Sequence, residues 1–169
     1  ESVNASSAPE MTPGRMSGIV TLMKAWNGVA NRACAAFSSE RSRPCTRART
    51  VIATLEETRD VQLLRRVLRD NEATIMQATP ATWRMLLESG WTNHERIRVL
   101  CGGEALRQDL AKGLLDVTEF LWNVYGPTET TIWSTWAELT EHEADRPTVG
   151  RPIANTRVYL LDPAGRPVL

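Results

Sequence analysis

The residue types best suited to chemistry are gathered in one short stretch, residues 123–131, which reads NVYGPTETT. Three of its hydroxyls could donate hydrogen bonds to phosphate oxygens, those of Thr128, Thr130 and Thr131. Glu129 could hold Mg²⁺, a hard cation that takes oxygen ligands and often shares them with substrate phosphates. Tyr125 could stack on a flat base. These residues favour nucleotide chemistry, although a threonine-rich hairpin with a chance glutamate explains the same letters as well.

Two predicted strands flank this stretch. Residues 120–122 are typical of a buried strand, and residues 132–136 alternate apolar and hydroxyl side chains as a second strand would. Gly126 lets the backbone approach a ligand without a side chain in the way, and Pro127 fixes the bend. The pattern therefore predicts a strand–turn–strand unit whose turn carries the chemistry.

Strands and helices alternate upstream of the turn. Short strands are predicted at residues 50–53, 73–78, 97–100 and 120–124, the first of them buried. Apolar residues at helical spacing separate the strands. The first predicted helix carries Val61, Leu64 and Leu68, with Arg65, Arg66 and Arg69 outward, and the third carries Leu106, Leu110 and Leu114. The second begins at the capping pair Thr79-Pro80, carries Trp83, Leu86 and Leu87, and ends before Gly90. This order predicts an α/β fold, a parallel sheet flanked by helices.

Ligands of such sheets bind at the carboxyl ends of the strands. Gln77, Gly102 and Tyr125 each fall at such an end. We therefore expect these three residues to lie along one crevice.

Composition excludes several functions. The chain has 169 residues, the length of one domain, and its formal net charge is zero, so nothing argues for capture by nucleic acid or membrane. No apolar run is long enough to span a bilayer, and no signal peptide is visible. Cys34, Cys45 and Cys101 are too widely spaced for a metal motif, which favours a cytoplasmic location. His94 and His142 are expected at the surface.

Five stretches, in order and in register, resemble the motifs of the adenylate-forming enzymes, and most closely those of the adenylation domains of nonribosomal peptide synthetases. They are residues 73–83, 99–106, 123–131, 149–153 and 158–162. The resemblance implies part of an AMP-binding (adenylation) domain at residues 48–169, within its large N-terminal domain. Residues 1–47 form a divergent or aberrant segment without such a match.

The resemblance also implies roles for individual residues. Gly102, Gly103, Glu104 and Ala105 would line the adenine pocket, and Asn123, Tyr125 and Gly126 belong to the nucleotide site. Thr128 would contact the α-phosphate and Glu129 would be the Mg²⁺ ligand, which makes these two the catalytic residues. The substrate-pocket positions fall on Gln77, Leu100, Gly102, Val124, Ile132 and Trp133. Ordinary core packing is the alternative reading for Leu100, Val124 and Ile132.

The implied reaction joins an amino acid to ATP, giving aminoacyl-AMP and pyrophosphate. The acyl group would pass to the phosphopantetheine thiol of a carrier domain, next to condensation domains of the parent synthetase. The pocket set resembles the pattern for glycine, since the ring of Trp133 would fill the volume that a side chain needs. Alanine is the near competitor, followed by serine and cysteine. An acyl-CoA ligase of the same superfamily and a non-catalytic fragment are the alternatives.

Several family features have no counterpart in this sequence. The family's Phe-Asp pair, whose Asp binds the substrate amine, is missing: Phe37 is followed by Ser38. No Gly/Ser/Thr-rich phosphate loop is present, and the ribose-binding Asp and the catalytic Lys are expected beyond Leu169. Residues 16–37 show helical spacing instead. The abrupt start of the family pattern near residue 48 suggests a reading-frame error or a spliced gene fragment upstream, with ordinary divergence as the alternative. We expect the chain to be an internal fragment that is inactive alone.

Overall fold

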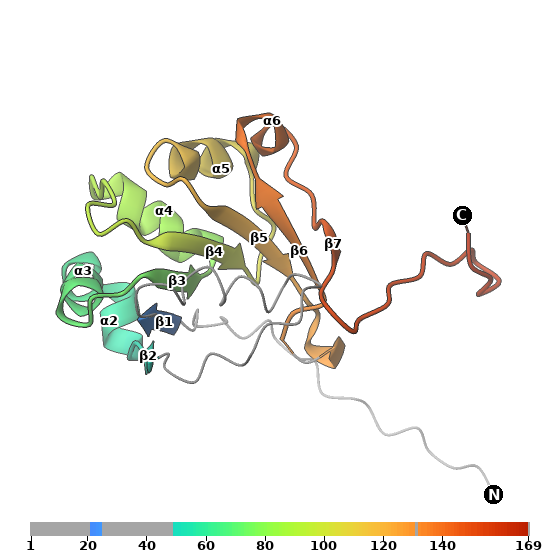
Figure 1. Ribbon diagram of the computed structural model, residues 1–169, viewed down its shortest axis with the longest axis horizontal. Coiled ribbons are helices and arrows are strands. Elements are labelled where there is room, and N and C mark those ends of the chain that lie inside the picture. The colour runs from blue at the N-terminus through green and yellow to red at the C-terminus, as the bar shows by residue number, and fades with distance from the viewer. Residues whose placement is uncertain (1–20, 25–48, 131, 169) are drawn as a thin grey trace, which may run out of the picture.

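The computed structural model describes residues 21–24, 49–130 and 132–168 (Figure 1). Within these residues the strands are β1 Thr21–Lys24, β2 Arg49–Ile52, β3 Ile75–Ala78, β4 Arg98–Gly102, β5 Leu121–Tyr125, β6 Thr135–Leu139 and β7 Arg151–Pro152. They form one sheet in the order β2-β1-β3-β4-β5-β6-β7.

The centre of the sheet is parallel and its flanks are antiparallel. β3 pairs with β4 and β4 with β5 in parallel, with helices in the connections between them. β6 and β7 continue the sheet antiparallel on one side, and β1 lies antiparallel to both β2 and β3 on the other. The chain passes from β5 to β6 without a crossover helix, which suits antiparallel pairing. The predicted α/β fold is confirmed, as a mixed sheet.

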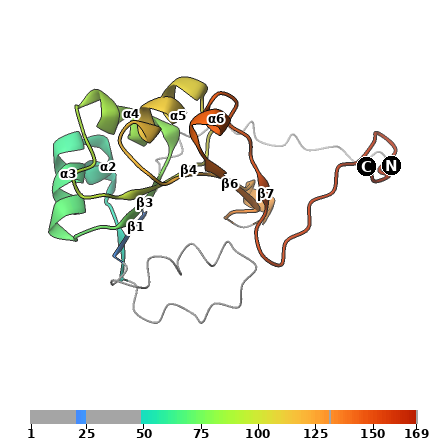
Figure 2. The same cartoon turned by 45° about the horizontal axis from the view of Figure 1, so that its top comes forward.

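The helices in the described residues are α2 Leu55–Arg59, α3 Val61–Asp70, α4 Pro80–Glu88, α5 Gln108–Leu115 and α6 Glu141–Ala144, with a 3-10 turn η2 at Thr128–Thr130. Figure 1 and the turned view in Figure 2 both show α3, α4, α5 and α6 on the same side of the sheet. This side is called the helix face below, and the opposite side is called the open face.

The predicted helices form where the sequence supplies both a cap and an apolar stripe. Asp60 caps α3, because its carboxylate accepts hydrogen bonds from the backbone N–H groups of Gln62 at 2.7 Å and of Leu63 at 3.1 Å. Leu64 and Leu68 of the stripe are fully buried. The Thr79-Pro80 start of α4 is also confirmed. The short helices α2 and α6 were not predicted, and each begins with a capping box.

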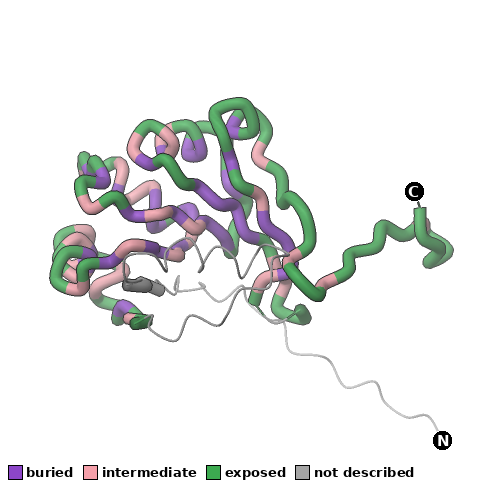
Figure 3. The backbone as a smooth tube through the Cα atoms, viewed as in Figure 1, coloured by how far each residue is buried: buried purple, intermediate pink, exposed green. Residues whose placement is uncertain are grey.

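Side chains alternate between two apolar clusters on opposite faces of the sheet. On the helix face, strand residues such as Val99, Cys101 and Leu121 pack against the helices. On the open face lies a second cluster of Trp122, Val124 and Trp136, packed with Leu100, Trp133 and Ile153. In Figure 3 the buried segments run along the central strands. The end of the open-face cluster meets the turn that follows β5.

Three predicted elements differ in the structure. The strand expected at residues 50–53 is β2, but it is not buried: it lies at the sheet edge and Ile52 is 68% exposed. Thr21–Lys24, inside the segment with helical spacing, forms strand β1, because sheet pairing overrides weak helical periodicity. The rest of residues 16–37 lies outside the described residues. The strand expected at residues 132–136 starts only at Thr135.

The segment from Ile153 onward extends away from the sheet in Figures 1 and 2. It closes a small turn in which the Asp162 carboxylate accepts hydrogen bonds from the backbone N–H groups of Ala164 and Arg166. Tyr159, Leu160 and Leu161 are exposed there. None of the helices in the described part of the chain is long and apolar enough to cross a membrane.

Candidate active site

The turn after β5 folds back on the chain that leads into β6. The Ser134 N–H donates to the Tyr125 carbonyl at 2.8 Å, and the Thr130 N–H donates to the Pro127 carbonyl at 3.1 Å. Gly126 is needed here because a Cβ atom on it would lie 2.3 Å from the Ile132 carbonyl oxygen. The folded turn leaves the side chains of Thr128 and Glu129 exposed.

The three threonines of the turn are not equivalent. The Thr130 hydroxyl donates to the Pro127 carbonyl at 3.0 Å, and its oxygen lies 2.5 Å from the Ser134 hydroxyl oxygen. The Thr130 hydroxyl is therefore hydrogen-bonded within the turn, and its expected contact with phosphate stays a prediction. Thr131 lies outside the described residues. Thr128 and Thr130 are both exposed among the threonines of the turn that the structure describes.

The residues expected to contact the adenine base lie within β5 or just after the end of β4. Tyr125 ends β5 and is 49% exposed, so its ring is available for stacking. Asn123 is buried, and its side-chain N–H donates to the Thr148 carbonyl at 2.8 Å, which ties β5 to the chain before β7. Gly103, Glu104 and Ala105 are exposed in the loop between β4 and α5.

Gly102, Val124 and Trp133 meet at one point of the open face. A Cβ atom on Gly102 would lie 2.4 Å from the Val124 carbonyl oxygen and 2.8 Å from Cη2 of the Trp133 ring. Only glycine fits there without a shift of the backbone or the ring. The Trp133 ring therefore occupies the space beside Gly102 that a larger pocket would leave empty.

The other expected pocket positions divide into two groups. Gln77 of β3 is the register partner of Leu100 of β4, and Leu100 packs in the same cluster as Val124 and Trp133. Leu100, Val124 and Trp133 thus share one cluster, with Gln77 paired beside Leu100. The crevice expected along Gln77, Gly102 and Tyr125 stays a prediction. Ile132 differs, because its side chain is 68% exposed.

Burial also sets the chemistry of Cys101 on β4. Desolvation and the nearby negative charge of Glu104 raise the pKa of its thiol to about 12. A thiol with such a pKa is a weak nucleophile at neutral pH. Cys101, which faces the helix-side cluster, is a packing residue.

Glu129 fits the way in which Mg²⁺ is usually bound. No group of three or more histidine, cysteine or carboxylate side chains is placed to hold a metal within the described residues. Mg²⁺ does not require one, because it often takes one or two protein carboxylates together with substrate phosphates and water. An exposed carboxylate beside the Thr128 hydroxyl supplies that kind of oxygen donor.

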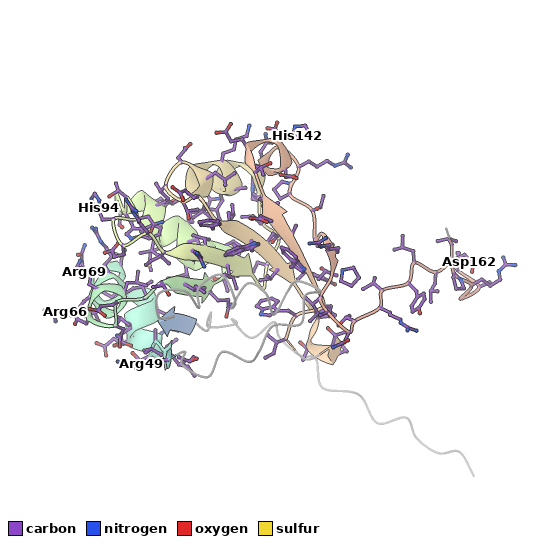
Figure 4. The ribbon with its side chains drawn as sticks, in the orientation of Figure 1. Arg49, Arg66, Arg69, His94, His142 and Asp162 are labelled. Carbon is purple, nitrogen blue, oxygen red and sulfur yellow. The ribbon has the colours of Figure 1, made fainter. Side chains whose placement is uncertain are left out.

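The two histidines and the outward arginines of α3 lie away from the turn after β5. Figure 4 shows His94 in the loop after α4 and His142 on α6, and both are exposed, as predicted. Arg66 and Arg69 project outward from α3 in the same view.

The sequence alone did not single out two residues of the site. Ser134 is buried and in contact with Thr130, and Thr148 accepts the Asn123 amide hydrogen bond. For Ser134 the signal was present: a small hydroxyl residue next to Trp133 at the return of the turn. For Thr148 the sequence holds no such signal, because it contributes a backbone carbonyl.

The sequence profile of the AMP-binding enzyme family matches residues 45–169. A dimodular nonribosomal peptide synthase of Bacillus subtilis (strain 168) is 45% identical over 121 residues, which cover 72% of this chain and 5% of that protein. A PKS-NRPS hybrid synthetase of Aspergillus candidus is 44% identical over 115 residues, covering 67% of this chain and 4% of that protein.

Solved structures agree with the sequence comparison. The crystal structure of holo-AB3403, a four-domain nonribosomal peptide synthetase bound to AMP and glycine, has a TM-score of 0.63 and 45% identity, covering 69% of this chain and 9% of that one. The o-succinylbenzoate coenzyme A synthetase of Bacillus subtilis, in complex with ATP and magnesium ion, is 20% identical with a TM-score of 0.56 over 65% of this chain and 23% of that one, and it shares the fold. The chain spans about 5% of the length of the curated relatives it matches. With its profile match and these relatives, the chain belongs to the AMP-binding enzyme family.

Proposed function

We propose that this chain is an internal part of the adenylation domain of a nonribosomal peptide synthetase, and that the parent enzyme activates glycine. In the proposed reaction a glycine carboxylate oxygen attacks the α-phosphorus of ATP. The bond from that phosphorus to the bridging oxygen breaks, and pyrophosphate leaves. Glycyl-AMP is the product that a carrier domain's phosphopantetheine thiol would receive.

In this proposal the chain's own residues position the nucleotide. Tyr125 would stack on the adenine, while the loop from Gly102 to Ala105 would border it with small or flexible groups. The Thr128 hydroxyl would donate to the α-phosphate, and the Glu129 carboxylate would hold Mg²⁺. When bound, Mg²⁺ supplies positive charge that neutralises the phosphates. Positioning and charge neutralisation are the main protein contributions to such a reaction.

The choice of glycine rests on one observation, the packing of the Trp133 ring against Gly102. Cη2 of Trp133 would be only 2.8 Å from a Cβ atom on Gly102, so the ring fills the space at the end of the proposed pocket. Leu100 and Val124 add apolar walls beside it, where a charged side chain would lose its hydration without gaining a partner. A similar solved structure has glycine bound, which supports the same choice.

The proposed pocket depth is tested by Trp133→Ala in the complete parent enzyme. Removing the ring should open the pocket, so alanine and valine should gain in amino-acid-dependent ATP–pyrophosphate exchange relative to glycine. Excluding one methyl group is worth about 1–3 kcal/mol, so a relative gain of at least about tenfold for alanine is expected. The measurement is kcat/KM for glycine, alanine and valine.

Trp136→Ala is the matched control. Trp136 belongs to the same open-face cluster, but the atoms nearest to a Cβ on Gly102 belong to Val124 and Trp133. Its removal should loosen the cluster without changing the ranking of the amino acids. An equal widening in both variants, or loss of all activity in Trp133→Ala at unchanged melting temperature, would argue against Trp133 as the residue that limits pocket depth.

A further inference from the structure

Ser134, Thr130 and Pro127 form a chain of hydrogen bonds across the base of the turn. The Thr130 hydroxyl donates to the Pro127 carbonyl at 3.0 Å, and the two hydroxyl oxygens of Thr130 and Ser134 are 2.5 Å apart. Ser134 is buried, although it carries a polar side chain. The Thr130 hydroxyl is therefore a specific partner of this buried hydroxyl.

The direction of this chain follows from counting protons. A hydroxyl has one proton to donate. Since Thr130 gives its proton to the Pro127 carbonyl, the proton between the two hydroxyls must come from Ser134. The order is thus Ser134 O–H to Thr130 O–H to Pro127 C=O, and each donor in such a series polarises and strengthens the next bond.

The chain joins two parts of the proposed site. At one end, Ser134 directly follows Trp133, whose ring lies against Gly102. At the other end, Pro127 and Thr130 enclose Thr128 and Glu129 in the 3-10 turn. The backbone of Ser134 is itself fixed, because its N–H donates to the Tyr125 carbonyl and its own carbonyl accepts from the Ile153 N–H at 3.0 Å.

From this geometry we propose that Ser134 is a positioning residue, which acts through Thr130 to hold the Thr128–Glu129 turn at a fixed place relative to Trp133. The inference rests on the proposed adenylation function and deepens it, since it assigns a role to a buried hydroxyl that touches neither substrate nor metal. A displacement of about 1 Å at reacting groups costs up to about a hundredfold in rate, so a single hydrogen bond in this place has a measurable effect.

The first test measures the turn itself in this chain, without activity. Ser134→Ala removes the first donor, and Thr130→Val removes the second hydroxyl at nearly constant shape. Both should speed amide hydrogen exchange in the peptide that spans residues 126–134, where the Thr130 and Ser134 N–H groups are bonded in the turn. Thr130→Ser keeps the hydroxyl and should exchange like the wild type. Unchanged exchange in both Ser134→Ala and Thr130→Val would overturn the proposal.

The second test measures ATP–pyrophosphate exchange in the complete parent enzyme. Ser134→Ala and Thr130→Val should each lower kcat by roughly tenfold, with KM for the amino acid within about twofold, because the turn is misplaced while the pocket remains. Thr130→Ser should retain most of the rate. The double variant should be no worse than either single one, because both substitutions break the same chain.

Ser89→Ala is the matched control. The Ser89 hydroxyl also donates to a backbone carbonyl, that of Leu86 at 2.6 Å, but at the end of α4. Its loss should leave kcat unchanged. Additive effects in the double variant, or an equal loss of kcat in Ser89→Ala, would overturn the role of Ser134. If the wild-type parent shows no amino-acid-dependent exchange, the proposed function fails, while hydrogen exchange still decides whether Ser134 holds the turn.

Discussion

At the scale of single residues, Glu129 is the side chain whose proposed chemical role is simplest to test. Its carboxylate is exposed, and it makes no hydrogen bond or ion pair within the part of the chain that the structure describes. A carboxylate without such a contact among the described residues is available to a ligand. The substitution of Glu129 therefore separates chemistry from folding.

Glu129→Gln in the complete parent enzyme should lower ATP–pyrophosphate exchange by about two orders of magnitude, because loss of a charged metal ligand removes several kcal/mol of transition-state stabilisation. The melting temperature should not change. Raising the Mg²⁺ concentration should recover part of the rate. Glu119→Gln, at another exposed carboxylate just before β5, is the control and should behave like the wild type. Full exchange activity in Glu129→Gln would remove this residue from the mechanism.

At the scale of elements, the sequence predicts what depends on local pattern. The helices α3, α4 and α5 and the strands β3, β4 and β5 follow from apolar spacing and caps, so their order and type were predictable. The edge strand β2 was wrongly predicted as buried, because exposure at a sheet edge depends on neighbours far along the chain. The loop at residues 132–134 has the alternation of a strand, but the packing of Gly126 against the Ile132 backbone forces the chain to turn there.

Within the candidate site, too, tertiary contacts are harder to predict from the sequence than local structure. The Trp133 ring lies beside Gly102, and the sequence expectation that it fills a substrate pocket stays a prediction. The hydrogen bond from the Thr130 hydroxyl to the Pro127 carbonyl was not predicted, since residue type alone cannot tell which hydroxyl closes a turn.

The close approach of β7 to β6 predicts that two glycine-to-alanine substitutions differ in their cost to stability. Gly150, just before β7, has a φ of +69°, and a Cβ atom there would lie 2.0 Å from the Trp136 carbonyl oxygen. Gly90 has a similar φ of +75° but nothing within 4 Å of that position. Gly90→Ala should therefore cost only the left-handed backbone strain, about 1–2 kcal/mol of unfolding free energy. Gly150→Ala should add about 1–3 kcal/mol for the steric clash.

Urea unfolding followed by far-UV circular dichroism measures both variants. Equal losses in the two proteins would mean that the close approach of Gly150 to β6 contributes nothing to stability.

At the scale of the whole molecule, the two faces of the sheet differ in what packs against them. The helix face buries the main core, which fixes the strands, and the strand ends present the turn, the glycine loop and the open-face cluster at one end. The chain covers about 5% of its curated relatives, so the activity proposed here belongs to the parent enzyme and this chain alone is expected to be inactive.

The most direct test of the account is amino-acid-dependent ATP–pyrophosphate exchange by the complete parent enzyme across the twenty amino acids. We expect exchange with glycine, weaker exchange with alanine because one methyl group is excluded by only about 1–3 kcal/mol, and none above background with bulky or charged amino acids. This chain alone, assayed in parallel, should show none. A preference for a bulky or charged amino acid would contradict the glycine pocket, and no exchange with any amino acid would contradict adenylation itself.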